Sequence, residues 1–342
     1  MDLTSLEIAV IGARGAVGAE LLSLLADRGV APARVRALGS EPSAGTRLPY
    51  GQQQVELIQT SREALDGAQL VLCSAGEDAA RTWAPRAAEL GARVIDNSTA
   101  FRTDPAVPLV VPEVNGDVLS TYQGSLVANP NCTTVLAVLA ATPIRRAFGL
   151  ERMSVASYQA VSGAGRQAME ELREQSAAVL AGEAPRAKVF AEPCAFNVFS
   201  HDSPVDPVSG QNEEERKLAV ESAKLWGDER TRVTATCVRV PVFRAHCAAL
   251  DLTLGEPAHE DRVRDLLRAS PGLELVDDRA RGSFPTPLAA AGRAEVLVGR
   301  LRPDPSQKVE SDGRAHGFQL FVAGDQLLKG AALNALQIAE AW

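Results

Sequence analysis

One cysteine near the middle of the chain stands where a nucleophile is expected. Cys132 follows the turn Asn129-Pro130-Asn131 and opens the apolar helical pattern of residues 133–147. A helix N-terminus lowers the pKa of a thiol and so favours the thiolate, which is the nucleophilic form. The Asn131 side chain could donate a hydrogen bond to an oxyanion that develops beside this sulfur. We therefore predict covalent thiol chemistry at Cys132 and expect buried, inert thiols at the other cysteines, Cys73, Cys194, Cys237 and Cys247.

Thiol chemistry needs a base, and His246 has the best position among the four histidines. Pro241 interrupts a strand pattern shortly before it, and Arg239 precedes that break. The break could turn both side chains into one cleft, although on spacing alone two separate solvated faces would be the default. The other histidines lie in polar loops or at a helix start, and no role is expected for them: His201, His259 and His316.

A glycine-rich stretch early in the chain has the pattern of a phosphate-binding turn. It reads Gly12-Ala13-Arg14-Gly15-Ala16-Val17-Gly18 and separates the apolar run 7–12 from a helical pattern at 16–28. Small residues let backbone N–H groups approach a pyrophosphate, and the helix N-terminus adds roughly half a positive charge. A tight turn that binds nothing can have the same glycines, but the position between a strand and a helix favours a dinucleotide site.

The segment 39–45 follows the second predicted strand, where such folds contact the adenosine ribose. An acidic residue there favours an unphosphorylated ribose, and an arginine favours a 2′-phosphate. Glu41 indicates the former, whereas the small side chains of Ser40 and Ser43 leave the choice open.

Arg102 and Lys217 are candidate ligands for an anionic group. Each would by default be a surface charge, and each gains weight only if the substrate is anionic. No metal site is expected, because the sequence has no HExxH motif and no other paired spacing of metal ligands.

The elements that must position these residues alternate in the first half of the chain. Strand-like runs followed by helical patterns imply parallel β-α-β units and a doubly wound, Rossmann-type sheet. We expect strands at 7–12, 35–38, 55–58, 69–73, 93–96, 109–111 and 126–128, and helices at 16–28 and 78–90. Later strand patterns predict a mixed sheet in a second, α+β domain, at 154–159, 232–240, 248–254, 295–301 and 317–322.

Composition narrows the possible functions of the 342-residue chain. Lys and Arg number 35 against 43 Asp and Glu, a net charge of −8. This balance argues against binding to nucleic acid or to a membrane surface, both of which usually need basic patches. The five cysteines are scattered and form no CxxC pair, which indicates reduced thiols and a cytoplasmic protein.

These motifs resemble those of the aspartate-semialdehyde dehydrogenase family along almost the whole chain. The matching stretches are GARGAVG at 12–18, VIDNSTAFR at 94–102, VPLVVPEVN at 107–115, ANPNCTT at 128–134, SYQAVSGAG at 157–165, EEERK at 213–217, RVPVFRAH at 239–246, EVLVGRLR at 295–302 and DQLLKGAALNALQIAE at 325–340. The number and order of these motifs set the resemblance apart from a lone glycine motif.

The resemblance implies a role for each matching residue. Cys132 corresponds to the nucleophile, His246 to the acid/base and Gln159 to the glutamine that orients the substrate. Arg239 corresponds to the ligand of the substrate carboxylate, and Glu214 to the residue near the substrate amino group. The phosphate site would comprise Arg102, Lys217 and Asn131, and the cofactor contacts Gly12, Arg14, Gly15, Ala16, Val17, Ser40, Glu41, Ser43, Ser162, Gly163 and Gln326.

The resemblance also implies a reaction and an assembly. The reaction is the reversible, NADPH-dependent reductive dephosphorylation of L-4-aspartyl phosphate to L-aspartate 4-semialdehyde, through a thioester on Cys132. It serves the biosynthesis of lysine and diaminopimelate, threonine, methionine and isoleucine. An NADP-binding domain is expected at 1–131 plus 326–342, and a catalytic and dimerisation domain at 132–325. The expected assembly is a homodimer, with a tetramer as the alternative.

Two residues depart from the usual family pattern. Arg14 stands where threonine is usual, and Pro42 stands where the arginine that binds the 2′-phosphate is usual. Either the preference for NADP is relaxed toward NAD, or Arg14 reaches the 2′-phosphate instead. Two other functions stay open: an N-acetyl-γ-glutamyl-phosphate reductase, with similar chemistry on a longer substrate, and a non-catalytic paralogue. The presence of Cys132, Gln159 and Arg239 favours the aspartyl substrate and an active enzyme.

Overall fold

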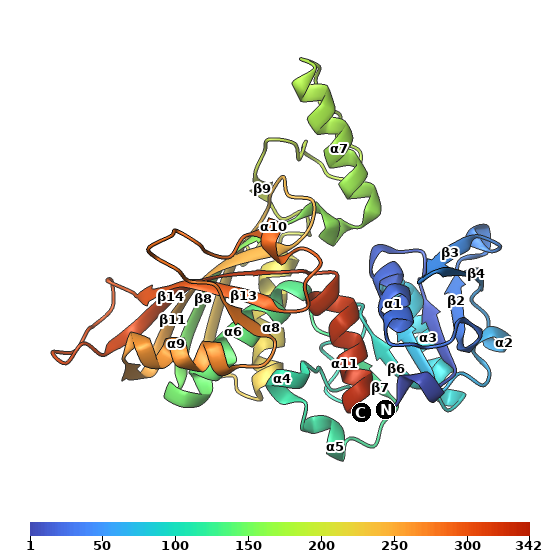
Figure 1. Cartoon of the computed structure of the whole chain (residues 1–342), viewed down its shortest axis with the longest axis horizontal. Coiled ribbons are helices and arrows are strands. Elements are labelled where there is room, and N and C mark those ends of the chain that lie inside the picture. Colours follow the sequence, from blue (N-terminus) through green and yellow to red (C-terminus); the bar gives the residue numbers. More distant parts are fainter. The chain divides into compact units, whose positions relative to one another are not determined.

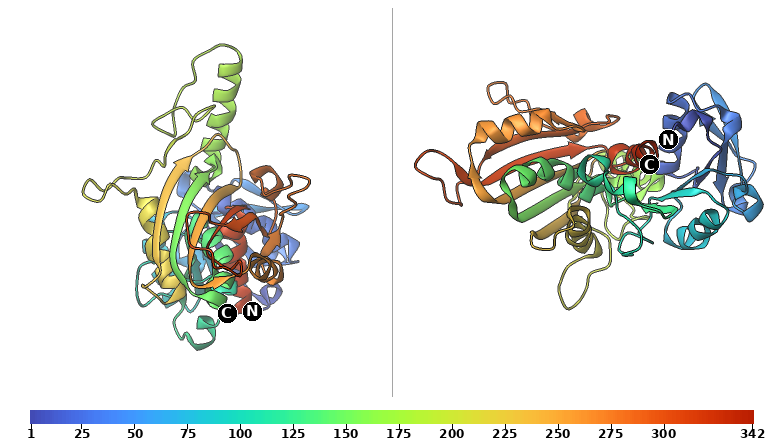
Figure 2. Two further views of the ribbon diagram at one scale, coloured as in Figure 1. Left: turned by 90° about the vertical axis from the view of Figure 1, so that its left-hand side faces the viewer. Right: turned by 90° about the horizontal axis from the view of Figure 1, so that it is seen from below.

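The computed structural model describes residues 1–342, which form two compact units (Figure 1). The first unit comprises Met1–Asn131 and Gly330–Trp342, so both ends of the chain belong to it. The second unit comprises Cys132–Lys329. Each unit contains one seven-stranded sheet, and Figure 2 shows these sheets from two further directions.

The sheet of the first unit has the strand order β3-β4-β2-β1-β5-β6-β7. Its strands are β1 (Ile8–Ile11), β2 (Val35–Gly39), β3 (Arg47–Tyr50), β4 (Gln53–Gln59), β5 (Leu70–Cys73), β6 (Arg93–Asp96) and β7 (Leu126–Ala128). Every neighbouring pair is parallel except β3–β4. The chain leaves β1 toward one side and later returns to the other side at β5, which confirms the predicted doubly wound sheet. Ligands of such sheets bind where this order reverses, beyond the carboxyl ends of the strands.

Both faces of this sheet are buried. Ile8 and Val10 of β1 join an apolar cluster with α1 (Ala16–Asp27) and α11 (Leu333–Ala341). Ala9 and Ile11 point to the opposite face and join a cluster with α3 (Glu77–Glu89). Burial on two faces explains why these strands read as continuous apolar runs. The other helices of the unit are short: α2 (Arg62–Leu65), α4 (Pro112–Asn115) and α5 (Val118–Thr121).

The strand predicted at 109–111 is wrong. Only a single bridge joins Leu109 to Ala128, and no ladder follows it. Prolines flank the segment at 108 and 112, and proline has no N–H to give to a ladder. Pro112 instead begins α4, because a fixed φ suits the first position of a helix.

The second unit contains the predicted mixed sheet, with the order β12-β13-β14-β11-β8-β10-β9. Its strands are β8 (Leu150–Gln159), β9 (Phe199–Ser200), β10 (Arg232–Arg239), β11 (His246–Ala258), β12 (Leu273–Leu275), β13 (Val296–Pro303) and β14 (Ala315–Gly324). Its helices are α6 (Cys132–Phe148), α7 (Arg166–Leu180), α8 (Glu213–Trp226), α9 (Glu260–Ala269) and α10 (Pro287–Ala290). Helices α6, α8 and α9 pack on this sheet (Figure 1).

Residues 326–329, which were expected in the first domain, fall in the second unit. The reason is that Gln326 is held within the second unit, where its Oε1 accepts the Ala245 N–H at 2.9 Å and its Nε2 donates to Ser162 Oγ. A π-helical turn, Leu328–Ala332, then leads into α11. None of the helices combines the length and the apolar character that crossing a membrane requires.

Candidate active site

Cys132 is the first residue of α6, at the position predicted for a nucleophile. It is partly exposed, whereas the other four cysteines are buried. Burial raises the pKa of Cys194 to about 11 and those of Cys237 and Cys247 to about 12, and it also raises that of Cys73. Those thiols stay protonated at neutral pH, so Cys132 is the thiol that a reagent or substrate can reach.

Three of the predicted site residues meet at one end of the second sheet. Gln159 and Arg239 end the parallel strands β8 and β10 and are direct partners in the ladder. His246 begins the antiparallel strand β11, whose next residue pairs with Tyr158 of β8. The sheet thus brings together residues that lie far apart in the sequence, and it does so on three adjacent strands.

His246 is completely buried, and one of its ring nitrogens has a fixed role. Its Nδ1 accepts the backbone N–H of Ala160 at 3.0 Å, so the neutral ring must hold its proton on Nε2. Nε2 is buried without a hydrogen-bond partner in the protein. Burial is the main cause that holds the pKa of His246 well below 6.5, and Arg239 and His201 add to it. The side chain is therefore a neutral hydrogen-bond donor with one free N–H.

Arg239 is only 2% exposed, yet its guanidinium has several polar partners. Nη1 donates to the Ala160 carbonyl at 3.0 Å, and Nε and Nη2 donate to Asp202 Oδ1 at 3.2 and 2.6 Å. Nη2 also lies 2.9 Å from His201 Nε2. The sequence reasoning missed both His201 and Asp202, because nothing in a polar loop indicates which strand end it will cover.

Helix α8 positions two more of the predicted residues. Glu214 is buried, and its Oε1 accepts Gln159 Nε2 at 3.3 Å. Lys217, one turn further along α8, places its Nζ 3.8 Å from Glu214 Oε2 and 3.4 Å from Glu213. A glutamine, a carboxylate and an ammonium group thus follow one another from the strand end to the helix.

Three predicted cofactor contacts also gather in this unit. Ser162 and Gly163 lie in a 3₁₀ turn, Val161–Ala164, and Gln326 donates to Ser162 Oγ. A Cβ added at Gly163 would lie 3.1 Å from His246 Nε2 and 3.2 Å from Arg239 Nη1. Glycine is therefore favoured there, because a side chain would press on both groups.

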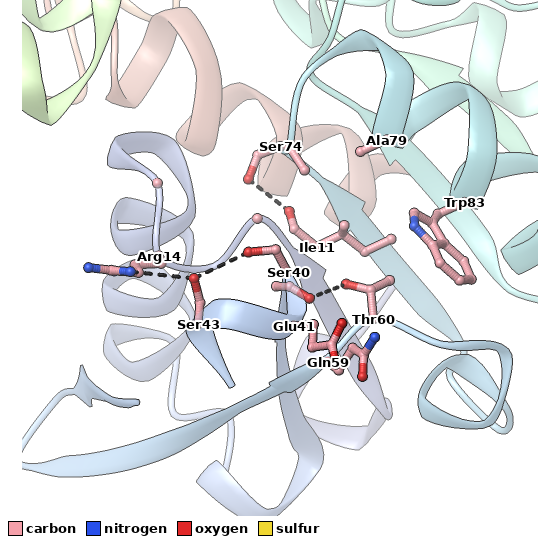
Figure 3. A pocket seen from close by; sticks show the side chains of 14 residues that line it. Ile11, Arg14, Ser40, Glu41, Ser43, Gln59, Thr60, Ser74, Ala79 and Trp83 are labelled. Carbon is pink, nitrogen blue, oxygen red and sulfur yellow. Dashed lines mark hydrogen bonds between the residues drawn. The ribbon is translucent and has the colours of Figure 1, made fainter. Parts of the chain in front are cut away.

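The first unit contains a cavity of about 610 Å³ at the carboxyl ends of its strands (Figure 3). Its lining includes Gly12, Arg14, Gly15, Ser40, Glu41 and Ser43, all of them predicted cofactor contacts. Arg14 donates to Ser43 Oγ at 3.4 Å, and Ser40 Oγ lies 3.3 Å from Ser43 Oγ. Arg14 is the one cation of the lining and Glu41 the one anion.

Two glycines of the turn 12–18, Gly12 and Gly18, are required by close backbone approach. Gly12 has a φ of +79°, and a Cβ on it would lie 2.7 Å from the Ser74 carbonyl oxygen. A Cβ on Gly18 would lie 2.2 Å from the Gly12 carbonyl oxygen. Gly15 precedes α1 as its N-cap, so the free N–H groups of the first turn remain available to an anion.

The other predicted residues of the first unit lie outside this lining. Ala16 and Val17 are in the first turn of α1 and do not line the cavity. Arg102 and Asn131 are buried, and Arg102 Nη2 donates to the Asn97 carbonyl at 2.8 Å. Sequence reasoning missed other residues of the lining, although each ends or follows a strand or lies on α3: Gln59, Thr60, Ser74, Ala75, Ala79 and Trp83.

Comparison with known proteins places this geometry in a known class. The model "Semialdehyde dehydrogenase, NAD binding domain" matches residues 7–122, and the model "Semialdehyde dehydrogenase, dimerisation domain" matches residues 142–329. The fold and the matched domains thus define an oxidoreductase of the semialdehyde dehydrogenase class that uses a nicotinamide cofactor.

Individual relatives narrow the class further. The aspartate-semialdehyde dehydrogenase of Synechocystis sp. is 43% identical over 98% of this chain and 96% of its own. That of Prochlorococcus marinus is 40% identical over 98% of this chain and 95% of its own. A crystal structure of aspartate semialdehyde dehydrogenase II from Vibrio cholerae, complexed with ASA, has a TM-score of 0.92 at 37% identity and covers 98% of this chain and 97% of that one. The chain belongs to the aspartate-semialdehyde dehydrogenase family.

Proposed function

We propose that the chain catalyses the reversible, NADPH-dependent conversion of L-4-aspartyl phosphate to L-aspartate 4-semialdehyde and phosphate. The observation that carries this proposal is the meeting of His246, Arg239, Gln159 and Glu214 at one end of the second sheet, in a member of this family. This set offers a donor for an oxyanion, a cation for a carboxylate and an anion for an ammonium group. An amino acid with a reactive side-chain carbonyl needs all three.

In the proposed mechanism, the Cys132 thiolate attacks the acyl carbon and displaces phosphate, which forms a thioester. The nicotinamide cofactor supplies a hydride to the thioester carbonyl when it is bound. The His246 Nε2–H then stabilises the hemithioacetal oxyanion by a hydrogen bond and keeps its proton. As the C=O bond re-forms, the C–S bond breaks, its electron pair returns to the Cys132 thiolate, and the aldehyde leaves. Arg102, Lys217 and Asn131 are proposed to bind the phosphate group.

The substrate ends have natural partners in the second unit. Arg239 is proposed to bind the α-carboxylate, because a guanidinium presents N–H groups in a plane that matches a carboxylate. Glu214 is proposed to receive the α-ammonium group, with Gln159 beside it to orient the reacting carbonyl. When both ends of a small substrate are held, its reacting carbonyl is also held in a fixed orientation.

We propose NADP as the cofactor, although the lining supports more than one outcome. The glycine turn and the cavity fit a dinucleotide, and Arg14 stands where it could pair with a 2′-phosphate. Glu41 in the same lining, and Pro42 beside it, favour an unphosphorylated ribose instead. NAD therefore remains the alternative.

The ratio of kcat/KM for NADPH and NADH tests this choice. We expect a preference for NADPH in the parent, and a loss of roughly tenfold in kcat/KM for NADPH alone in Arg14→Ala, since one charge-assisted hydrogen bond is removed. A strict NADPH preference that survives Arg14→Ala would contradict the role of Arg14. Equal rates with both cofactors in the parent would favour the alternative.

The reaction itself is tested by reduction of NADP in the presence of aspartate semialdehyde, with and without phosphate. We expect reduction that depends on both compounds. Turnover with N-acetyl-γ-glutamyl semialdehyde in place of aspartate semialdehyde would favour the reductase of the longer substrate, and no turnover with either would contradict the proposed function.

We propose that the protein is a homodimer. Tyr158 of β8 is 40% exposed and forms a tilted ring pair with Phe321 of β14, at 6.2 Å between centroids, across the intervening strand β11. Its neighbours along β8 alternate, since Met153, Val155 and Ser157 are buried and the residues between them are partly exposed. One face of the sheet thus offers partly apolar surface to a second copy, and a tetramer remains the alternative.

A further inference from the structure

The guanidinium of Arg239 is enclosed by a segment of chain that runs from residue 190 to residue 202. The Phe190 ring lies 5.3 Å from its central carbon, in cation–π contact, and Asp202 accepts from two of its nitrogens. His201 contributes a third contact, at 2.9 Å from Nη2. None of these partners is a neighbour of Arg239 in the sequence, so the segment acts on this side chain through the fold alone.

A guanidinium has five N–H groups, and their use here is uneven. The N–H of Nε and both N–H groups of Nη2 face Asp202 and His201, and one N–H of Nη1 is taken by the Ala160 carbonyl. The remaining N–H is on Nη1. This atom and His246 Nε2 both lie against Gly163, so the free donor of the arginine and the free donor of the histidine share one neighbourhood.

We propose that His201 and Asp202 are positioning residues for Arg239, which hold its Nε–Nη2 side so that only the Nη1 side receives the substrate carboxylate. The proposal rests on the proposed function, because it assumes a substrate with a carboxylate. Phosphate plays no part in this contact. The pair acts through Arg239 and is not itself in contact with the reacting atoms.

His201 makes this contact sensitive to pH. Its Nε2 can accept from Arg239 Nη2 only when the ring is neutral with its proton on Nδ1. Nδ1 lies 3.1 Å from Ser203 Oγ, to which it donates in that tautomer, and 3.1 Å from the Ser203 backbone N, whose N–H favours the other tautomer. A protonated ring would place a second cation against the guanidinium. Burial is the main cause that lowers the pKa of His201. The positive charges of Arg239 and Lys217 lower this pKa further, whereas the negative charges of Glu214 and Asp202 raise it. The charge of His201 in turn helps to lower the pKa of His246.

The first test compares Asp202→Asn with the matched control Asp206→Asn, whose carboxylate accepts from loop N–H groups at 208 and 209. We expect the KM for aspartate semialdehyde to rise roughly tenfold in Asp202→Asn with kcat nearly unchanged, since an amide oxygen holds the guanidinium less strongly than the charge-assisted contact does. The control should keep both values. An unchanged KM would overturn the proposal, and a lower KM would overturn it by showing that Asp202 competes with the substrate carboxylate.

A second measurement does not depend on turnover. The Arg239 Nε–H resonance, identified by its absence in Arg239→Lys, should be protected from solvent exchange in the parent and lose that protection in Asp202→Asn. Persistence of the protection would overturn the proposal. If the parent shows no activity with aspartate semialdehyde, the proposed function fails, whereas this resonance still decides the positioning role.

The third test uses pH. We expect the KM of the parent to rise as pH falls below 6.5, the ordinary histidine value, because protonated His201 repels Arg239. His201→Gln should remove most of this rise, because an amide oxygen accepts from Nη2 at every pH. His316→Gln, at the surface beside Glu310, should retain the rise. A rise of the same size in His201→Gln would contradict the role of His201.

Discussion

At the scale of single residues, burial separates one thiol from the others. Cys132 begins α6 and is partly exposed, whereas burial raises the pKa of Cys247 to about 12. Burial also lowers the pKa of His246 and so favours its neutral ring. The hydrogen bond from the Ala160 N–H to Nδ1 then places the ring proton on Nε2. A reachable thiol and a neutral N–H donor are the two groups that thioester chemistry asks of the protein.

Replacing Cys132 by alanine should abolish turnover and leave the fold intact, because a small side chain at a helix start contributes little packing. We expect at least a thousandfold loss of kcat, as for other nucleophile deletions, with an unchanged melting temperature. Cys247→Ala, in a buried position, should keep the rate and lose stability instead. Iodoacetamide followed by mass spectrometry should modify Cys132 first, and labelling of another cysteine would contradict its assignment.

The lowered pKa of His246 predicts a stability profile. The unfolded chain binds a proton at this side chain near pH 6.5, whereas the folded protein binds it only at much lower pH, so the unfolded chain carries more protons in that window. The free energy of unfolding should therefore be highest above pH 6.5 and fall on acidification, by at most about 1.4 kcal/mol per pH unit from this group.

Urea unfolding at several pH values measures this profile. His246→Gln should flatten the acidic decline, and His316→Gln should leave it as in the parent. His201, whose pKa is also lowered, will keep part of the slope. A slope that His246→Gln does not change would show that the buried ring is not its source.

At the scale of elements, strand ends and helix starts position the site. The parallel strands β8 and β10 present Gln159 and Arg239 side by side, and the antiparallel strand β11 adds His246. Helix α8 begins with a capping box, in which Asn212 Oδ1 accepts the Glu215 N–H at 2.9 Å and Glu215 Oε2 accepts the Asn212 N–H at 3.0 Å. This start places Glu214 against Gln159.

Removing the cap should therefore affect stability and substrate binding together. Asn212→Ala is expected to cost about 1 kcal/mol, since the hydrogen bond from the Glu215 N–H to the Asn212 side chain is lost. The first turn of α8 would fray, so the KM for aspartate semialdehyde should rise. Asn212→Ser, which retains a capping oxygen, should restore most of both values. A change in stability with no change in KM would show that the start of α8 does not influence substrate binding.

At the scale of the whole molecule, each unit has one sheet and one proposed task. The first unit has the doubly wound sheet and the cavity beside the glycine turn. The second has the mixed sheet, with the proposed substrate contacts at one end and Tyr158 and Phe321 as a ring pair. The chain passes from the first unit to the second between Asn131 and Cys132, and returns between Lys329 and Gly330.

A charge at Tyr158 tests the proposed dimer. Tyr158→Asp should reduce the mass measured by light scattering from that of a dimer to that of the 36.1 kDa chain, because burial of an unpaired carboxylate opposes association. Leu288→Asp, at a 90% exposed position, is a control that should keep the parent mass. A parent that is already monomeric would contradict the dimer itself.

Local pattern alone determined much of this protein. Ile8–Ile11 followed by the glycines at 12, 15 and 18 indicated a strand, a phosphate-binding turn and a helix, because periodicity and backbone freedom are properties of adjacent residues. The same holds for Cys132 at a helix start. Pro108 and Pro112 show the limit, since the apolar run between them reads as a strand but cannot form a ladder.

Only the tertiary structure decided which distant residues meet. His201 was expected to have no role, and the fold places it against Arg239. Gln59, Thr60 and Trp83 reach one cavity from two separate stretches of chain, the end of β4 and helix α3. Such meetings depend on strand order and on the path of a loop over a sheet, which are set by the sum of many weak contacts between segments. No short window of sequence contains that sum, so the roles of these residues follow from the fold.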